Sequence, residues 1–241
     1  MKKTNLFISF HFLAIILFVI SSCKGSGSIN GSGKQISEIR EVQTFSDIEI
    51  HGAMKVVLKQ DFNQQVSVSA DDNVQQYIEV KVNNETLKIE MDDKVGDSGP
   101  ITVYLNAKDF KGIQASGAVD ITSDGNLKVQ DFLLDLSGSS KVNLNLNAAN
   151  LITKSSGSSD IKLVGQASSH DVDMSGSGSI EALDFIAGKY HIESSGSNKL
   201  RINVLNELSV NSSGSSDVEY RGNPATVKND NSGSSRVQKI N

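Results

Sequence analysis

Two pairs of adjacent carboxylates are the residues best suited by type to acid–base chemistry. Asp71 and Asp72 stand in "DDNV", and Asp92 and Asp93 stand in "EMDD". Glycoside hydrolysis uses two carboxyl groups about 5–10 Å apart, one as the acid and the other as the base or nucleophile. These four acids are therefore the only carboxylate clusters worth testing for a polysaccharide lyase or hydrolase. We keep that enzyme as the less favoured alternative.

The four histidines show no metal-ligand spacing. His11 belongs to the leader, while His51, His170 and His191 are far apart in the sequence and have no cysteine partner. His191 and Glu193 are predicted to share the outer face of one strand, which indicates a solvated surface rather than a catalytic pair. We therefore expect no metal site.

Motifs for phosphate, calcium or a nucleophile are also incomplete. "GSGK" at residues 31–34 lacks the glycine that a phosphate loop needs at Ser28 and the hydroxyl residue that it needs at Gln35. "SGSSDIKL" is faintly similar to a calcium-binding nonapeptide, but a basic residue such as Lys141 takes the aspartate position in several repeats. No G-x-S-x-G elbow occurs, and we expect the serines to lack a nearby base. We expect no catalytic residue and no cofactor.

The first 22 residues are predicted to be a targeting segment. Two lysines precede an apolar run that extends from Leu6 to Ile20, which is typical of a secretory signal peptide. "ISSC" at its end resembles a bacterial lipobox, and by that resemblance Cys23 becomes the first mature residue and carries lipid. A membrane-spanning helix is disfavoured, because it needs about 20 apolar residues and polar residues follow Ile20 at once.

The composition limits the partners of the mature chain. Without the leader and its two lysines, 21 basic residues face 28 acidic ones, which gives a net charge of −7. This mild acidity argues against nucleic acid as a partner, since nucleic-acid binding requires a basic face. Cys23 is the only cysteine, so no internal disulfide forms and a core must hold the fold. Aromatic residues make up only 5% and tryptophan is absent, so no aromatic cage for sugars is evident.

A repeat of about 19–20 residues dominates the second half of the chain. Ser-Gly pairs recur there at steps of 21, 19, 19, 20, 18 and 19 residues, a regularity that random linkers would not keep. The glycines of these pairs are Gly117, Gly138, Gly157, Gly176, Gly196, Gly214 and Gly233. We interpret the pairs as corners. Glycine there provides a positive φ without Cβ strain, and small hydroxyl side chains stack and form hydrogen bonds.

Apolar and polar residues alternate on both sides of each corner. An apolar residue stands four positions after each of the seven glycines, and its neighbours on either side are polar. Such alternation predicts half-buried β-strands. Repeats this short cannot bury their apolar faces alone, so consecutive repeats must stack. We therefore predict an all-β fold, a right-handed parallel β-helix (β-solenoid) of 19–20-residue coils with Ser-Gly corners. Its hand follows from β-crossover chirality and from the family resemblance given below.

Outward positions of consecutive repeats carry largely alternating charge. Cross-strand pairs of opposite charge stabilise in-register stacking by about 0.2–1 kcal/mol each. One column contains Asp120, Lys141, Asp160, Ser179, Lys199, Asp217 and Arg236, and the next contains Lys162, Glu181, Arg201 and Glu219.

The pattern before the first repeat is looser but still indicates strands. "SDIEIHGAMKVVLKQ" alternates around Gly52, and "QVSVSAD", "IEVKVNNETLKIEM" and "ITVYLN" are further strand candidates, with a hairpin turn at Asn83-Asn84. A separate β-domain for this region is the alternative to irregular coils. The predicted parts are a lipoprotein signal peptide (1–22), a Gly/Ser-rich tether (23–41), irregular N-terminal β coils (42–115) and regular solenoid repeats with a polar C-terminal cap (116–241).

Several of these segments together resemble a known family. The lipobox, "FSDIEIHGAMKVVLKQ", "VNNETLKIEM" and the recurring SGSS corners are similar to the "putative auto-transporter adhesin" head domain, or GIN domain, which is common in lipoproteins of Bacteroidetes. The resemblance covers about Val42 to the C-terminus and implies a β-solenoid similar in outline to pectin lyases but without their catalytic residues. It supplies no catalytic residue to carry over, and the adhesive role that it implies is itself a proposal from architecture.

These observations lead to a non-enzymatic lipoprotein of the cell envelope. We expect a lipid anchor at Cys23 in the outer membrane, with the choice between its outer surface and its periplasmic face left open. The solenoid surface is expected to bind a glycan or a protein, and assembly into a homo-oligomer is left open. A periplasm-facing structural component is the alternative in which the partner is another envelope protein.

Overall fold

The structure, a computed structural model, describes residues 28–241. The predicted signal peptide and Cys23 lie outside the described residues. Within residues 28–241 the fold is all-β, as predicted, and the one helical turn there is the 3₁₀ turn η1 (Gln75–Tyr77). The strands are β1 (Gln35–Arg40), β2 (Asp47–Gln60), β3 (Gln65–Asp71), β4 (Ile78–Asn83), β5 (Thr86–Met91), β6 (Thr102–Ala107), β7 (Gly112–Lys128), β8 (Asp131–Gly214), β9 (Asp217–Arg221), β10 (Thr226–Asn231) and β11 (Arg236–Lys239).

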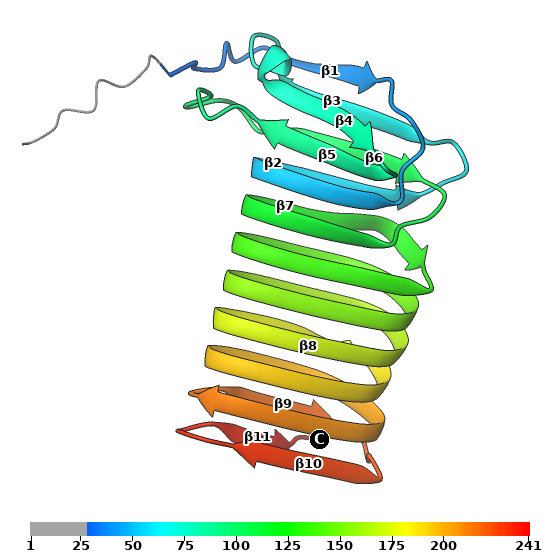
Figure 1. Cartoon of the computed structure of the whole chain (residues 1–241), viewed down its shortest axis with the longest axis vertical. Helices are drawn as coiled ribbons and strands as arrows, with labels where there is room; N and C mark the ends of the chain where they lie inside the picture. The colour runs from blue at the N-terminus through cyan, green and yellow to red at the C-terminus, as the bar shows by residue number, and fades with distance from the viewer. Residues whose placement is uncertain (1–27) are drawn as a thin grey trace, which may run out of the picture.

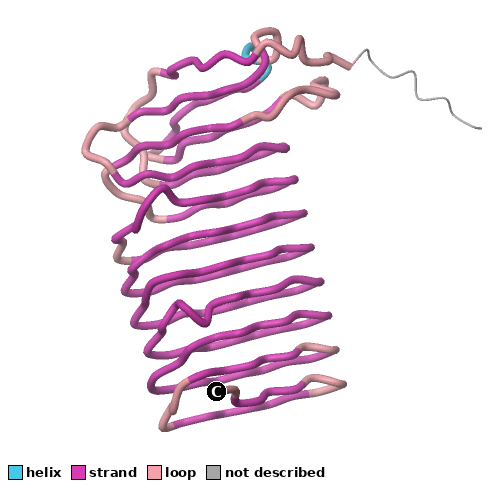
Figure 2. The backbone as a smooth tube through the Cα atoms, turned by 180° about the vertical axis from the view of Figure 1, so that it is seen from behind, coloured by secondary structure: helices cyan, strands magenta, loops and turns pink. Residues whose placement is uncertain are grey.

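The strands form one large mixed sheet. Its order is β1-β3-β6-β2-β7-β8-β9-β11, with β10 beside β8, β5 beside β2 and β4 beside β5. β8 alone runs for 84 residues and turns back on itself repeatedly, so that Figures 1 and 2 show it as a stack of layers.

The parallel pairs follow the step of the sequence repeat. β2 pairs with β7 so that Gly52 stands opposite Gly117, and β7 pairs with β8 so that Gly117 stands opposite Gly138. The step persists at the other end of the stack, where Asp217 of β9 pairs with Lys199 of β8 and with Arg236 of β11. Residues at equivalent positions of consecutive repeats therefore lie side by side.

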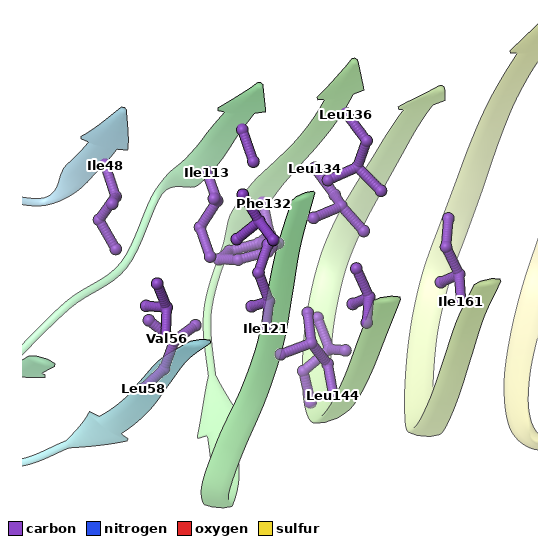
Figure 3. Packing of buried hydrophobic residues seen from close by; sticks show 14 of the residues in the cluster. Ile48, Val56, Leu58, Ile113, Ile121, Phe132, Leu134, Leu136, Leu144 and Ile161 are labelled. Atoms are coloured by element: carbon purple, nitrogen blue, oxygen red, sulfur yellow. The ribbon is translucent and has the colours of Figure 1, made fainter. Parts of the chain in front are cut away.

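The core lies between the facing layers and consists of the inward residues of each strand. The apolar residues four positions after the corner glycines are at most 2% exposed in all repeats but the last. Figure 3 shows members of this core, including Ile121, Leu144 and Ile161, pointing into the space between the layers. Each fully buried side chain of this type contributes roughly 1.5–3 kcal/mol to folding. The alternation of apolar and polar residues in the sequence therefore identifies the residues that form the core.

The N-terminal strands extend the same sheet with a different pattern. β3 pairs antiparallel with β1 and β6, and β4 with β5 form a hairpin. The predicted turn of that hairpin is one residue off: it is formed by Asn84 and Glu85, which have φ of 48° and 63° and stand between the paired Asn83 and Thr86. β1 lies within residues 23–41, where the sequence predicted a tether, because its backbone finds a partner in β3.

The last layer is mostly polar and leaves one edge of the sheet open. β10 is almost entirely exposed, and Val237 in β11 is only half-buried. Polar side chains on such an edge disfavour pairing with a further chain.

Candidate functional site

Asp71, the first of the candidate acids, is buried and serves the fold. Its carboxylate is 1% exposed and accepts hydrogen bonds from the Gln35 amide (Nε2–Oδ1, 2.6 Å) and the Gly99 backbone N–H (N–Oδ2, 3.0 Å). The buried charge is thereby satisfied, as buried polar groups require. Asp71 fastens β1 and the loop before β6 to the end of β3.

Asp72, its neighbour, fastens the segment that precedes β1. Its carboxylate accepts a hydrogen bond from the Ser32 hydroxyl at 2.6 Å and forms an ion pair with Lys34 at 3.2 Å. The Ser32 hydrogen bond and the Lys34 ammonium lower the pKa of Asp72 below its ordinary value. A general acid would need a raised pKa, so the environment of Asp72 opposes that role.

Asp92 and Asp93 lie on an open surface. Together with residues such as His51 and Tyr77 they line a hollow of about 710 Å³. The Asp92 carboxylate accepts the Lys94 backbone N–H at 2.9 Å, and both acids are exposed. Solvent screens charges in such a place, and no wall excludes water from a reacting centre. The two acid pairs therefore do not form the dry carboxylate dyad that would support glycoside cleavage.

The structure brings together three residues that the sequence interpretation kept apart. The His51 ring contacts the Ser116 hydroxyl through Nδ1 (2.6 Å) and the Glu49 carboxylate through Nε2 (2.5 Å). The statement that no serine has a nearby base is therefore wrong. His51 and Ser116 are 65 residues apart in sequence but are directly paired between β2 and β7. His51 precedes Gly52, and Ser116 precedes Gly117. This equivalent position before a glycine is the sequence signal that indicates that the two residues lie side by side.

The Glu49–His51–Ser116 group has the residue types of a nucleophilic triad but lacks its surroundings. In such triads the serine contacts Nε2 and the acid contacts Nδ1, the reverse of the arrangement seen here. β7 is paired on one side by β2 and on the other by β8, so the backbone N–H groups around Ser116 are engaged in the sheet. Stabilisation of an oxyanion requires free N–H donors aimed at the reacting atom. We interpret the group as a hydrogen-bonded surface chain between two layers.

The other two histidines are separated, as their spacing indicated. His191 and Glu193 form an exposed pair (3.4 Å) on one strand. His170 is fully buried, its Nε2 contacts Thr153 Oγ1 at 2.9 Å, and burial lowers its pKa to about 3. Among residues 28–241, no group of three or more His, Cys, Asp or Glu is arranged to hold a metal ion.

The Ser-Gly corners place glycine on glycine through the stack. The seven corner glycines have φ between 76° and 126°. A Cβ added to Gly157 would lie 2.4 Å from the carbonyl oxygen of Gly138, so both conformation and space require glycine there. The short side-chain hydrogen bonds at the corners join flanking serines, as between Ser155 and Ser159 (2.6 Å), while the serine before each glycine is more exposed.

Charges on the outer face are paired across layers in part of the predicted columns. Arg201 bridges Glu181 (2.9 Å) and Glu219 (3.0 Å), and Arg236 pairs with Asp217 (2.8 Å). Hydrogen bonds to Glu181 and Glu219 raise the pKa of Arg201. These charges of the repeated surface are therefore paired by neighbours in adjacent layers.

The fold and these sites define a repetitive all-β protein in which Asp71, Asp72 and Asp92 are engaged in structural contacts. The chain belongs to the family described as "Putative auto-transporter adhesin, head GIN domain", which matches residues 44–224. No curated protein matches the chain. Adhesion is the function that the family description suggests.

Solved structures from other bacteria share this fold. A "putative adhesin" from Bacteroides fragilis has a TM-score of 0.80 at 21% identity, covering 88% of this chain and all of that one. A "putative adhesin" from Parabacteroides distasonis has a TM-score of 0.72 at 20% identity, with the same coverage. A "putative lipid binding protein" from Parabacteroides distasonis has a TM-score of 0.66 at 22% identity, covering 89% of this chain and all of that one. At these identities the likeness concerns the fold.

Proposed function

We propose that this protein is a non-enzymatic, lipid-anchored protein of the cell envelope that binds a glycan or protein through the outer surface of a right-handed β-solenoid. The parallel pairing at repeat steps and the stacked corner glycines support the solenoid. The right hand follows from the strong preference of parallel crossover connections.

The anchor in this proposal is Cys23 with lipid on its thiol and amine. The resemblance of "ISSC" to a lipobox supports it. No helix in residues 28–241 is both long and apolar enough to cross a membrane. A lipid at Cys23, just before the described part of the chain, would hold the N-terminal strands nearer the membrane than β10 and β11.

A binding role rather than catalysis is supported by one observation above all: three of the four acids that suggested an enzyme are engaged in hydrogen bonds within the fold, and the fourth, Asp93, is exposed. Asp71 and Asp72 secure the segment around β1, and Asp92 caps a turn on an open surface. The family description and the rigid, self-paired layers support adhesion as the kind of binding.

Protease shaving of intact cells tests the proposal, with Cys23→Ala as the unanchored control. We expect cleavage of the wild-type protein on unbroken cells and release of the Cys23→Ala protein from the membrane fraction. Protection until the outer membrane is opened would instead support a periplasm-facing structural component. Turnover of a polysaccharide by the purified protein would overturn the non-enzymatic role.

A further inference from the structure

Phe62 is the most exposed large apolar side chain in the described part of the protein. It is 86% exposed, against 46% for Tyr104, the next most exposed aromatic. It stands between β2 and β3 in the stretch "DFNQQ", where every neighbour is polar. Single exposed apolar residues are common on protein surfaces, so the meaning of this ring depends on the groups around it.

The loop that carries Phe62 is fixed at both ends. The Asp61 N–H donates to the Ala107 carbonyl (2.9 Å), and the Asp61 carboxylate accepts the Asn63 N–H (3.0 Å). Beyond the ring, the Gln64 amide donates to the Gln43 carbonyl (2.9 Å). The ring is therefore presented by an ordered loop, which reduces the entropy lost when a ligand binds.

Two hollows flank the ring, and separate parts of the chain build them. One hollow, of about 440 Å³, lies between Phe62, the β6–β7 connection and the end of β7; the other, of about 400 Å³, extends toward Thr44 and Lys111. Figure 1 shows the β2–β3 and β6–β7 connections on the same side of the stack.

The Gln60 side chain locks these parts to one another. Its amide N–H groups donate to the carbonyls of Lys108 (2.9 Å) and Lys128 (3.0 Å), and its oxygen accepts the Lys128 N–H (2.8 Å). A single side chain thus holds the backbone at both lysines close to the loop that carries the ring. Loops fastened in this way keep the geometry of a site.

The polar side chains around Phe62 are balanced in charge and available to a ligand. Lys108 and Lys128 supply two ammonium groups, and Asp61 and Asp109 supply two carboxylates. No ion pair within residues 28–241 engages any of these four. An anionic ligand or membrane would meet the two carboxylates as well as the lysines. A neutral ligand rich in hydroxyl groups finds both donors and acceptors.

We propose that Phe62 and the hollow beside it bind a pyranose unit of a neutral glycan. This inference rests on the proposed binding function and assigns it a site. The apolar face of the sugar ring covers Phe62, while its hydroxyl groups hydrogen-bond to Asp61, Asp109 and the two lysines. Placing the apolar ring under the sugar removes both surfaces from water.

The test is calorimetric titration of the purified mature chain with neutral hexasaccharides of β-1,4-glucan, β-1,4-xylan and β-1,4-mannan. Oligogalacturonate and phosphatidylglycerol vesicles serve as acidic and membrane probes. Phe62→Ala is expected to weaken neutral-glycan binding about tenfold, the upper end for loss of one aromatic contact. Phe62→Tyr should retain it. Leu205→Ala, another exposed apolar site in β8, is the matched control and should change nothing.

The outcomes test the Phe62 site separately from the proposed binding function of the whole protein. Loss with Phe62→Ala alone supports the site. Binding that survives Phe62→Ala, preference for oligogalacturonate or vesicles, or no binding to any neutral probe overturns it. If intact cells still adhere to a surface in a manner that depends on this protein, the binding function stands although the site has failed. If shaving places the protein in the periplasm, adhesion at the cell surface is refuted. The titration still measures whether Phe62 contributes to glycan binding.

Discussion

The regular part of the molecule, β7 to β11, and the N-terminal part, β1 to β6, use the same sheet in different ways. In the regular part each layer pairs in parallel with a near-copy of itself, and its outward charges meet partners such as Arg201 and Glu219. In the N-terminal part antiparallel strands and long connections place unlike residues together, as at Phe62 and Lys108.

This difference shows where distinct chemistry can arise in a repetitive fold. Equivalent positions of stacked repeats hold equivalent residues, so side chains there satisfy one another along the stack. Connections between non-equivalent strands are free of that constraint and border the two hollows beside the exposed aromatic ring. Function in such folds concentrates in loops on a rigid scaffold.

The largest expected effect contrasts a corner glycine with a glycine at the irregularity of β7 between Thr122 and Asn126. Gly157→Ala places a Cβ 2.4 Å from a carbonyl oxygen at φ +126°, whereas Gly125→Ala, at φ +92°, meets nothing within 4 Å. Denaturant unfolding should show a loss of about 3 kcal/mol or more for Gly157→Ala and of about 1 kcal/mol for Gly125→Ala. Equal losses would mean that the layers move apart freely and that the glycine stack does not set their spacing.

A second test separates the two parts by local stability. Asp71→Ala leaves the Gln35 amide and the Gly99 N–H without their acceptor, at a cost of about 1–3 kcal/mol. Hydrogen exchange should accelerate in β1 while β8 keeps its protection. Asp93→Ala, which alters an exposed acid, is the control and should leave both unchanged. Faster exchange throughout β8 would show that the N-terminal strands and the repeats unfold as one unit.

The regular core should carry a pH-dependent stability that comes from a buried histidine. Burial lowers the pKa of His170 to about 3 from 6.5, so between these values the unfolded chain binds a proton that the folded chain does not. The contribution of His170 is complete above about pH 6.5 and falls by about 1.4 kcal/mol per pH unit below it.

Unfolding at several pH values measures this slope. His170→Gln, which can still hydrogen-bond to Thr153 but does not titrate, should have a shallower slope than the wild type between pH 6.5 and 4. His191→Gln, at an exposed position, should keep the wild-type slope. A slope that His170→Gln does not reduce would assign the acid sensitivity to carboxylates elsewhere.

The smallest expected effect concerns the charge columns of the regular part. Arg201→Met removes the bridge to Glu181 and Glu219 on the solvent side, where ion pairs are weak and screened by salt. The melting temperature should fall slightly at low salt and match the wild type at high salt. Lys141→Met, at an equivalent outward column without an ion pair in the described structure, is the control. A salt-independent loss would instead indicate packing by the arginine stem.

Much of the regular part could be predicted from the sequence, because local alternation decides which residues point inward. Ile161, Leu163 and Ile180 are buried where the pattern placed them, and the glycine spacing matches the register of the parallel strands. The strands β2 to β6 were also found as segments, whereas β1 fell within the predicted tether. Their order in the sheet was not, since β3 joins β6 and β1 through pairings that no repeat encodes.

The candidate site was much less predictable. The sequence indicated Asp71 and Asp72 as a possible catalytic pair. The role of a carboxylate depends on its partners, and here the partners Gln35, Gly99 and Ser32 come from distant segments of the chain. Phe62 carried a faint signal as a lone aromatic residue in a polar loop. Nothing in that stretch indicates that Lys108 and Lys128 stand beside it.

The sequence by itself determined the strand content, the repeat length, the inward and outward faces and the family. These properties depend on residue type and spacing within one repeat. Only the tertiary structure decided which residues of different layers and loops meet, as with His51 and Ser116 across 65 positions. Such contacts form when the layers stack and when the connections between strands pack against one another. Both depend on long-range pairing that no local pattern specifies.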